Sequence, residues 1–170
     1  MTYLLITVIF MYHLNFDSVY VKTKLSKKKQ RFFEIARHVS LMSSFTFNSG
    51  RAVRIGCIIV SNKKHIIASG YNQRKTHPRQ YVLNSKAKAN HINQNKKNCS
   101  FIHAEIDAIT SKSVTDWHLY NKSEIYLYRE DMNGNLACSR PCESCMSELK
   151  NIGISKIHYT DINGFFSEEI

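Results

Sequence analysis

The chain has 170 residues, 43% of them hydrophobic, with six Gly, two Pro and a formal net charge of +11. This composition fits one domain with its own core, and it excludes a collagenous, disordered or low-complexity polymer. The longest apolar run, Tyr3 to Tyr12, is too short to span a membrane and lacks the preceding Lys or Arg of a signal peptide, so we expect a soluble, cytoplasmic protein.

The first half of the chain predicts an extension, a helix, a β-hairpin and a long loop. The extension shows no helical period, whereas the helix has apolar residues at intervals of three and four and Ser26 as its cap. Two β-rich runs flank a short polar turn, and the segment after them has little apolar periodicity. The extension is residues 1–25 and the helix is Ser26 to Met42. The hairpin is Arg54 to Val60 with His65 to Tyr71, and the loop is residues 72–100. Residues 26–170 form the predicted domain.

The second half predicts helices that alternate with strands. Pro141 is placed at the first position of its helix, where the missing N–H costs no hydrogen bond. The elements are a helix over Phe101 to Ile109, a strand over Glu124 to Tyr128, a turn at Asn133-Gly134, a helix over Pro141 to Asn151 and a strand over Lys156 to Thr160. This order is typical of a three-layer α/β domain, in which helices cover both faces of a mixed sheet.

The charge is divided unequally along the chain. Residues 1–104 hold 18 Lys or Arg and two acids, whereas residues 105–170 hold six Lys or Arg and 11 acids. The basic half favours an anionic partner, either a nucleotide phosphate or a single-stranded nucleic acid, although a solvated basic surface explains it equally well. Candidates for phosphate or substrate contact are Arg74, Lys75, Arg79, His77 and His91, and a solvated loop is the alternative for each.

Two short motifs carry the candidate chemistry. His103-Ala104-Glu105 and Pro141-Cys142-Glu143-Ser144-Cys145 are both placed at helix starts. Five Cys is an odd number for a disulfide framework, and a C-x-x-C pair with one imidazole offers three soft ligands to one ion. Zinc suits these ligands and keeps a fourth position for water, whose proton is then lost near neutral pH. Glu105, beside the metal but not bound to it, could carry that proton to a leaving amine.

The H-x-E and P-C-x-x-C pair is the signature of zinc nucleobase deaminases. With Ser69-Gly70-Tyr71-Asn72 as a third motif, the chain resembles the cytidine and deoxycytidylate deaminase superfamily over residues 26–162, including small virus-encoded deaminases. The resemblance implies a three-layer α-β-α fold with a mixed sheet of about five strands. It also implies a zinc-dependent hydrolase acting on a cytosine base, and we expect a free nucleotide such as dCMP as its substrate.

The resemblance also assigns roles to single residues. Glu105 is the expected catalytic residue, and the expected Zn²⁺ ligands are His103, Cys142 and Cys145. For the substrate, it implies that Asn72 contacts the sugar. It further implies that the amide of Ala104 contacts the ring carbonyl and that the carbonyl of Arg140, just before Pro141, holds the amine.

Several alternatives stay open. The same chemistry could edit a cytosine, or a tRNA adenosine, in single-stranded DNA or RNA, and the host cytoplasm is the expected location if the chain is viral. A catalytically silent zinc-binding module is a third reading. A closed structural zinc site would use Cys99 or Cys138 as its fourth ligand. A homo-oligomer is compatible with the resemblance.

Overall fold

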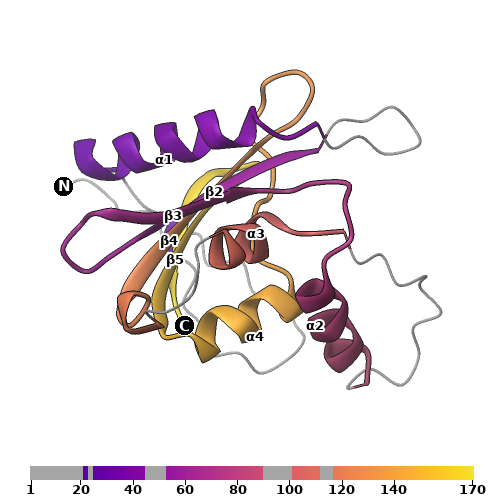
Figure 1. The fold of residues 1–170 in the computed structure, drawn as a ribbon. Coiled ribbons are helices and arrows are strands. Elements are labelled where there is room, and N and C mark those ends of the chain that lie inside the picture. The colour runs from indigo at the N-terminus through magenta and orange to yellow at the C-terminus, as the bar shows by residue number, and fades with distance from the viewer. Residues whose placement is uncertain (1–20, 23–24, 45–52, 90–100, 112–116) are drawn as a thin grey trace, which may run out of the picture.

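The structure, a computed structural model, describes residues 21–22, 25–44, 53–89, 101–111 and 117–170. Its centre is a mixed sheet (Figure 1), whose strand order is β1-β6-β5-β4-β2-β3. Strands β4 and β5 are parallel, and the other neighbouring pairs are antiparallel. The strands are β1 (Val21–Lys22), β2 (Arg54–Val60), β3 (Ile66–Tyr71), β4 (Ser123–Glu130), β5 (Ile154–Asp161) and β6 (Gly164–Glu169). The predicted mixed sheet of five strands is confirmed, and the two-residue β1 extends one edge.

Helices cover both faces of the sheet, as the three-layer prediction requires. Figure 1 shows α1 on one face and α3 and α4 on the other, with α2 beside α4. The helices are α1 (Lys27–Ser40), α2 (Pro78–Ala89), α3 (Ala104–Thr110), α4 (Glu143–Asn151) and the 3-10 helix η1 (Trp117–Leu119). Among the described helices, none has the length and apolar character needed to cross a bilayer.

Strand β2 shows why the sheet needs helices on both sides. Cys57 and Ile59 belong to the core between the sheet and helices α3 and α4, whereas Ile58 and Val60 belong to the core under α1. All four side chains are completely buried. A strand with both faces buried is apolar at every position, which explains the run of β-branched residues in this segment.

Helix α1 follows the sequence prediction closely. The Ser26 hydroxyl accepts a hydrogen bond from the Lys29 amide and so caps the helix. Phe32 and Phe33 are buried against the ring of Tyr126 on β4, at centroid distances of 5.0 and 5.4 Å. The helix ends at Ser40, two residues before the predicted end.

The prediction of a loop over residues 72–100 is wrong where α2 forms. Pro78 opens this helix, and the ring Nδ1 of His77 accepts a hydrogen bond from the Arg79 amide. Tyr81 and Val82 are about half exposed, whereas the polar Gln80 is completely buried. The buried face of α2 therefore combines the polar Gln80 with Leu83 while two apolar residues face solvent, so a search for apolar periodicity could not detect this helix.

Three other boundaries differ from the sequence prediction. The helix predicted from Phe101 begins at Ala104, because the Ile102 backbone first pairs with Lys75 and Gln73. The helix predicted from Pro141 begins two residues later, after Cys142 as its N-cap. Strand β6 was not predicted. Residues 1–20 of the predicted extension, and residues 90–100 with His91 and Cys99, lie outside the described residues.

The strand directions bring several chain segments to one edge of the sheet. Strand β2 is antiparallel to both β3 and β4, and its Gly56 lies between Tyr71 of β3 and Tyr128 of β4. The carboxyl ends of β3 and β4 therefore meet at the same edge. Helix α4 connects the parallel strands β4 and β5, so its N-terminus lies near the carboxyl end of β4.

Two glycines set the distance between the sheet and its helices. A Cβ at Gly70 would lie 2.2 Å from the Ala108 nitrogen and 2.5 Å from the Ala104 oxygen of α3. A Cβ at Gly56 would lie 2.3 Å from the Ser40 nitrogen of α1, on the opposite face. Because backbone atoms cannot yield as a flexible side chain can, a methyl group at either position must displace a helix.

We expect Gly70→Ala and Gly56→Ala each to lower the free energy of unfolding by about 1–3 kcal/mol, measured by urea denaturation. Only Gly70→Ala displaces the helix that starts beside His103, so only this variant should also weaken zinc binding, by about tenfold in a chelator competition. Equal zinc affinity in the two variants would show that the α3 contact does not position the metal ligand.

Candidate active site

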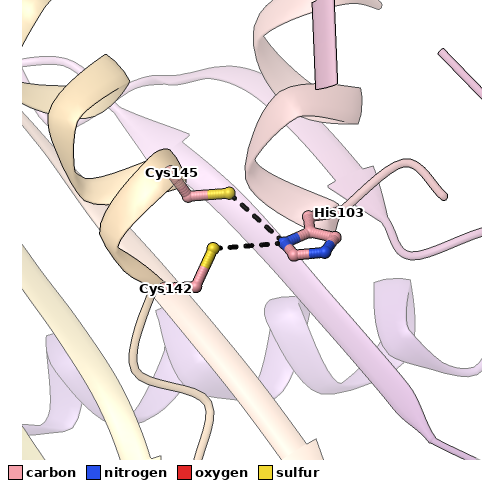
Figure 2. Close-up of side chains that lie close together, drawn as sticks. All are labelled: His103, Cys142 and Cys145. Atoms are coloured by element: carbon pink, nitrogen blue, oxygen red, sulfur yellow. Dashed lines mark hydrogen bonds between the residues drawn. The ribbon is translucent and has the colours of Figure 1, made fainter. Parts of the chain in front are cut away.

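Three potential metal ligands meet where α3 and α4 begin. His103 is the N-cap of α3, Cys142 is the N-cap of α4, and Cys145 lies in the first turn of α4. The Sγ atoms of Cys142 and Cys145 lie 3.5 and 3.4 Å from Nδ1 of His103. Figure 2 shows both thiols pointing toward the imidazole, and the three ligand atoms lie within 4.8 Å of one another. The structure thus brings the three expected ligands together.

The two cap positions leave these side chains available to a metal. An N-cap side chain often turns back to accept a hydrogen bond from its own helix, but neither His103 nor Cys142 does so. Their backbone carbonyls still begin the helices, by accepting hydrogen bonds from the Asp107 and Met146 amides at 2.9 and 2.8 Å. The imidazole and the thiol can therefore project beyond the helix ends toward each other.

The chemistry of the three donors fits Zn²⁺. One imidazole nitrogen and two sulfurs form the soft ligand set that zinc prefers. A hydrogen bond from Cys145, with a smaller contribution from His103, lowers the pKa of the Cys142 thiol to about 4. The thiolate is the form that binds a metal, so the arrangement favours binding at neutral pH.

Glu105 lies beside the three ligands and is the second residue of α3. The residue is only 5% exposed. Burial raises the pKa of the Glu105 carboxyl to about 7, and the nearby charge of His103 partly opposes this shift. A carboxyl group with a pKa near neutrality can both accept and donate a proton under physiological conditions.

A cavity of about 300 Å³ opens onto this group, a volume at the lower end of small-ligand pockets. The three residues expected to bind substrate all line it: Asn72, Ala104 and Arg140. The side chain of Asn72 is already engaged, because its Oδ1 accepts from the Ile55 amide at 2.8 Å and its Nδ2 donates to the Val53 carbonyl at 2.7 Å. Asn72 therefore also shapes the cavity wall.

The side chain of Arg140 is held by β6. Its Nε and Nη2 atoms donate to the two carboxylate oxygens of Glu168 at 2.7 and 3.0 Å. The Glu168 side chain is 1% exposed, and it also accepts a hydrogen bond from the Tyr159 hydroxyl. The positive charge of Arg140 is therefore neutralised, and the ion pair fixes the backbone that precedes the two cysteines.

A second arginine of the cavity, Arg129, was missed in the sequence analysis. Its Nη1 donates to the Cys138 carbonyl at 3.1 Å, whereas its buried Nε has no hydrogen-bond partner. It makes no ion pair within the described part of the chain. Side chains two residues apart on a strand share a face, so Arg129 lies on the same face of β4 as Ile125 and Leu127. Those two residues belong to the core under α3 and α4, and this alternation could have identified Arg129.

Gln80 was also missed, since it lies within the predicted loop. It is completely buried on α2, and its Oε1 accepts a hydrogen bond from the His103 amide at 3.1 Å. Its side-chain amide also acts on Cys145, whose thiolate it favours. No sequence signal marks this glutamine, because its role depends on a helix that periodicity did not indicate.

Other candidates from the sequence have structural partners. Arg79 forms an ion pair with Glu148 and so links α2 to α4. His77 accepts a hydrogen bond at the start of α2, and neither residue lines the cavity. Cys138 lines the cavity, but among the described residues the group that could hold a metal consists of His103, Cys142 and Cys145 without it.

A sequence model of one family, described as "Cytidine and deoxycytidylate deaminase zinc-binding region", matches residues 26–161. The match covers most of the chain and includes every residue assigned to the metal group. The chain therefore belongs to the cytidine and deoxycytidylate deaminase family. No curated protein sequence matches it significantly.

Solved structures of deaminases are similar at low sequence identity. A dCMP deaminase from the cyanophage S-TIM5 is 20% identical, with a TM-score of 0.47, over 79% of this chain and 84% of that chain. A cytidine deaminase from Mycobacterium leprae is 15% identical, with a TM-score of 0.45, over 81% and 90% of the two chains. The family assignment rests on the sequence model and not on these likenesses.

We expect Cys142→Ala and Cys145→Ala each to reduce zinc from close to one ion per chain to near zero, because two protein ligands hold zinc far less tightly than three. Metal analysis after dialysis against a weak chelator measures this loss. Cys138→Ser is the matched control and should keep its zinc. A comparable loss in Cys138→Ser would indicate a closed site with four protein ligands.

Proposed function

We propose that the protein is a zinc-dependent hydrolytic deaminase of a cytosine base, acting on a free nucleotide such as dCMP. The observation that carries this proposal is that His103, Cys142 and Glu105 all line one cavity. It combines a metal-binding group with a buried carboxyl whose pKa is about 7. Membership of the deaminase family supports the same chemistry.

Glu105 would move protons during the reaction. Zinc bound by the three ligands supplies the Lewis acidity that makes water a nucleophile at neutral pH. Glu105 takes a proton from the water that adds to C4 of the base and gives it to the ring nitrogen N3. A second proton from the same water then passes through Glu105 to the amino group, which leaves as ammonia, and a uracil carbonyl remains.

The walls of the cavity would hold the base and the sugar. The backbone amide of Ala104 is proposed to bind the ring carbonyl, and the carbonyl of Arg140 to bind the departing amine. Asn72 is proposed to contact the sugar, using the hydrogen-bonding capacity that its contacts to residues 53 and 55 leave. Support for these roles comes from the position of all three residues along the cavity.

Arg129 supports a nucleotide as the substrate. The other arginine of the cavity, Arg140, is neutralised by Glu168, whereas Arg129 has no carboxylate partner in the described segments. An arginine offers five N–H donors in a planar fork, which matches the oxygens of a phosphate. Here one donor is used by the Cys138 carbonyl and the buried Nε is unpaired. A phosphate bound by the remaining terminal N–H groups would compensate the charge.

Replacing Glu105 with Gln should lower kcat for dCMP by about 10²–10⁴-fold, because the amide cannot accept the proton from water. Zinc content should stay close to one ion per chain. Ammonia release and metal analysis on the same sample measure the two quantities. Glu143→Gln, the same change at an exposed position next to Cys142, should keep full activity.

Two results would contradict the proposed chemistry. Ammonia release by Glu105→Gln at the wild-type rate would exclude Glu105 as the proton carrier. Zinc-loaded wild-type protein that deaminates no cytosine or adenine nucleoside, nucleotide or short single strand would indicate a silent zinc-binding module.

Arg129→Gln should lower kcat/KM for dCMP by about 10–100-fold and leave kcat/KM for deoxycytidine almost unchanged, since only the nucleotide has a phosphate for the guanidinium. Arg54→Gln removes the same charge from an exposed position on β2 and should change neither value. Equal losses for both substrates would assign Arg129 a structural role. A wild-type preference for single-stranded DNA or RNA over dCMP would favour base editing.

A further inference from the structure

We propose that Gln80 of α2 positions the zinc ligands, by binding one from each of the two helices that carry them. Its Oε1 accepts from the backbone amide of His103 at 3.1 Å, and its side-chain amide is close enough to the sulfur of Cys145 to favour the thiolate. Gln80 is completely buried, so water cannot replace it in these contacts.

The contact to His103 supplies a side-chain acceptor for the His103 N–H, which α3 itself lacks. In a capping box, a Glu or Gln at the third helical position binds the N–H of its own N-cap residue. The third position of α3 is Ile106, whose side chain has no acceptor and lies in the core. Gln80 therefore accepts the N–H of His103 from a different helix, and so fixes the residue that carries the imidazole.

The contact to Cys145 uses the opposite end of the same amide. A side-chain amide has two N–H donors, and one of them binds Oδ1 of Asn84 at 2.9 Å, one turn further along α2. A donor that faces a metal-binding sulfur stabilises its negative charge and reduces its donation of electrons to the metal. Gln80 thus orients His103 and reduces the electron donation of the Cys145 sulfur to the metal.

Helix α2 is itself held in place beside the site. Arg79, the neighbour of Gln80, forms an ion pair with Glu148 of α4, and Leu83 is buried in the core that α3 and α4 share. The amide of Gln80 is also restrained by Asn84. These contacts fix the amide before a metal binds, which makes Gln80 a positioning residue and not a ligand.

The test compares Gln80→Met with Leu83→Val in the full chain. The methionine has a similar length but neither donor nor acceptor, so zinc affinity from chelator competition should fall by about 10–100-fold. After Co²⁺ replaces Zn²⁺, the sulfur-to-cobalt charge-transfer bands should move to lower energy, because the sulfur has lost a hydrogen-bond donor. Leu83→Val loosens the packing of α2 without touching a ligand and should change neither quantity.

Gln80→Glu is the second variant, in case the methionine variant does not fold. It keeps the acceptor for His103 but places a negative charge against the sulfur, so we expect weaker zinc binding than in the wild type at neutral pH. Zinc affinity within twofold of wild type together with unchanged cobalt bands, in either variant, would overturn the proposal, as would an equal loss in Leu83→Val. The inference rests on the metal site, so an inactive protein that still shows these shifts would refute the proposed deamination alone.

Discussion

The convergence of two helix starts on one edge of the sheet is the constraint on which the site depends. Antiparallel pairing of β2 with β3 and β4 brings the carboxyl ends of those two strands together, and the parallel β4–α4–β5 crossover adds the start of α4. Gly70 then lets α3 approach until its backbone touches the sheet. His103 and the two cysteines, about 40 residues apart in sequence, meet only because these backbone relations hold.

Burial has different consequences for three charged side chains of the cavity, which are Arg140, Glu105 and Arg129. Arg140 is balanced by a buried carboxylate that also binds the Tyr159 hydroxyl, so this pair is structural. Glu105 forms no ion pair among the described residues, and desolvation, partly opposed by the charge of His103, raises its pKa into the range useful for proton transfer. Arg129 keeps a buried, unpaired Nε within the same walls. The same cavity is therefore lined by an arginine held in an ion pair, a titratable carboxyl and an arginine that forms no ion pair within the described segments.

The sequence predicted the features that depend on local patterns. Ser26 with its apolar periodicity indicated α1, the β-branched run indicated β2, and the spacing of His103, Cys142 and Cys145 indicated the metal group. It did not predict α2, since its buried positions include a glutamine while Tyr81 and Val82 face solvent. Nor did it predict β6, which its pairing with β5 stabilises. The roles of Gln80 and Arg129 depend on contacts between distant segments, which no local pattern encodes.

The ion pair between Arg140 and Glu168 links the metal loop to a strand that follows it by more than 20 residues. During translation, Cys142 and Cys145 leave the ribosome before this carboxylate does. The loop that precedes them can therefore gain its anchor only after β6 has joined the sheet. The anchor of the segment that precedes the two cysteines is therefore supplied by a strand that is synthesised after them.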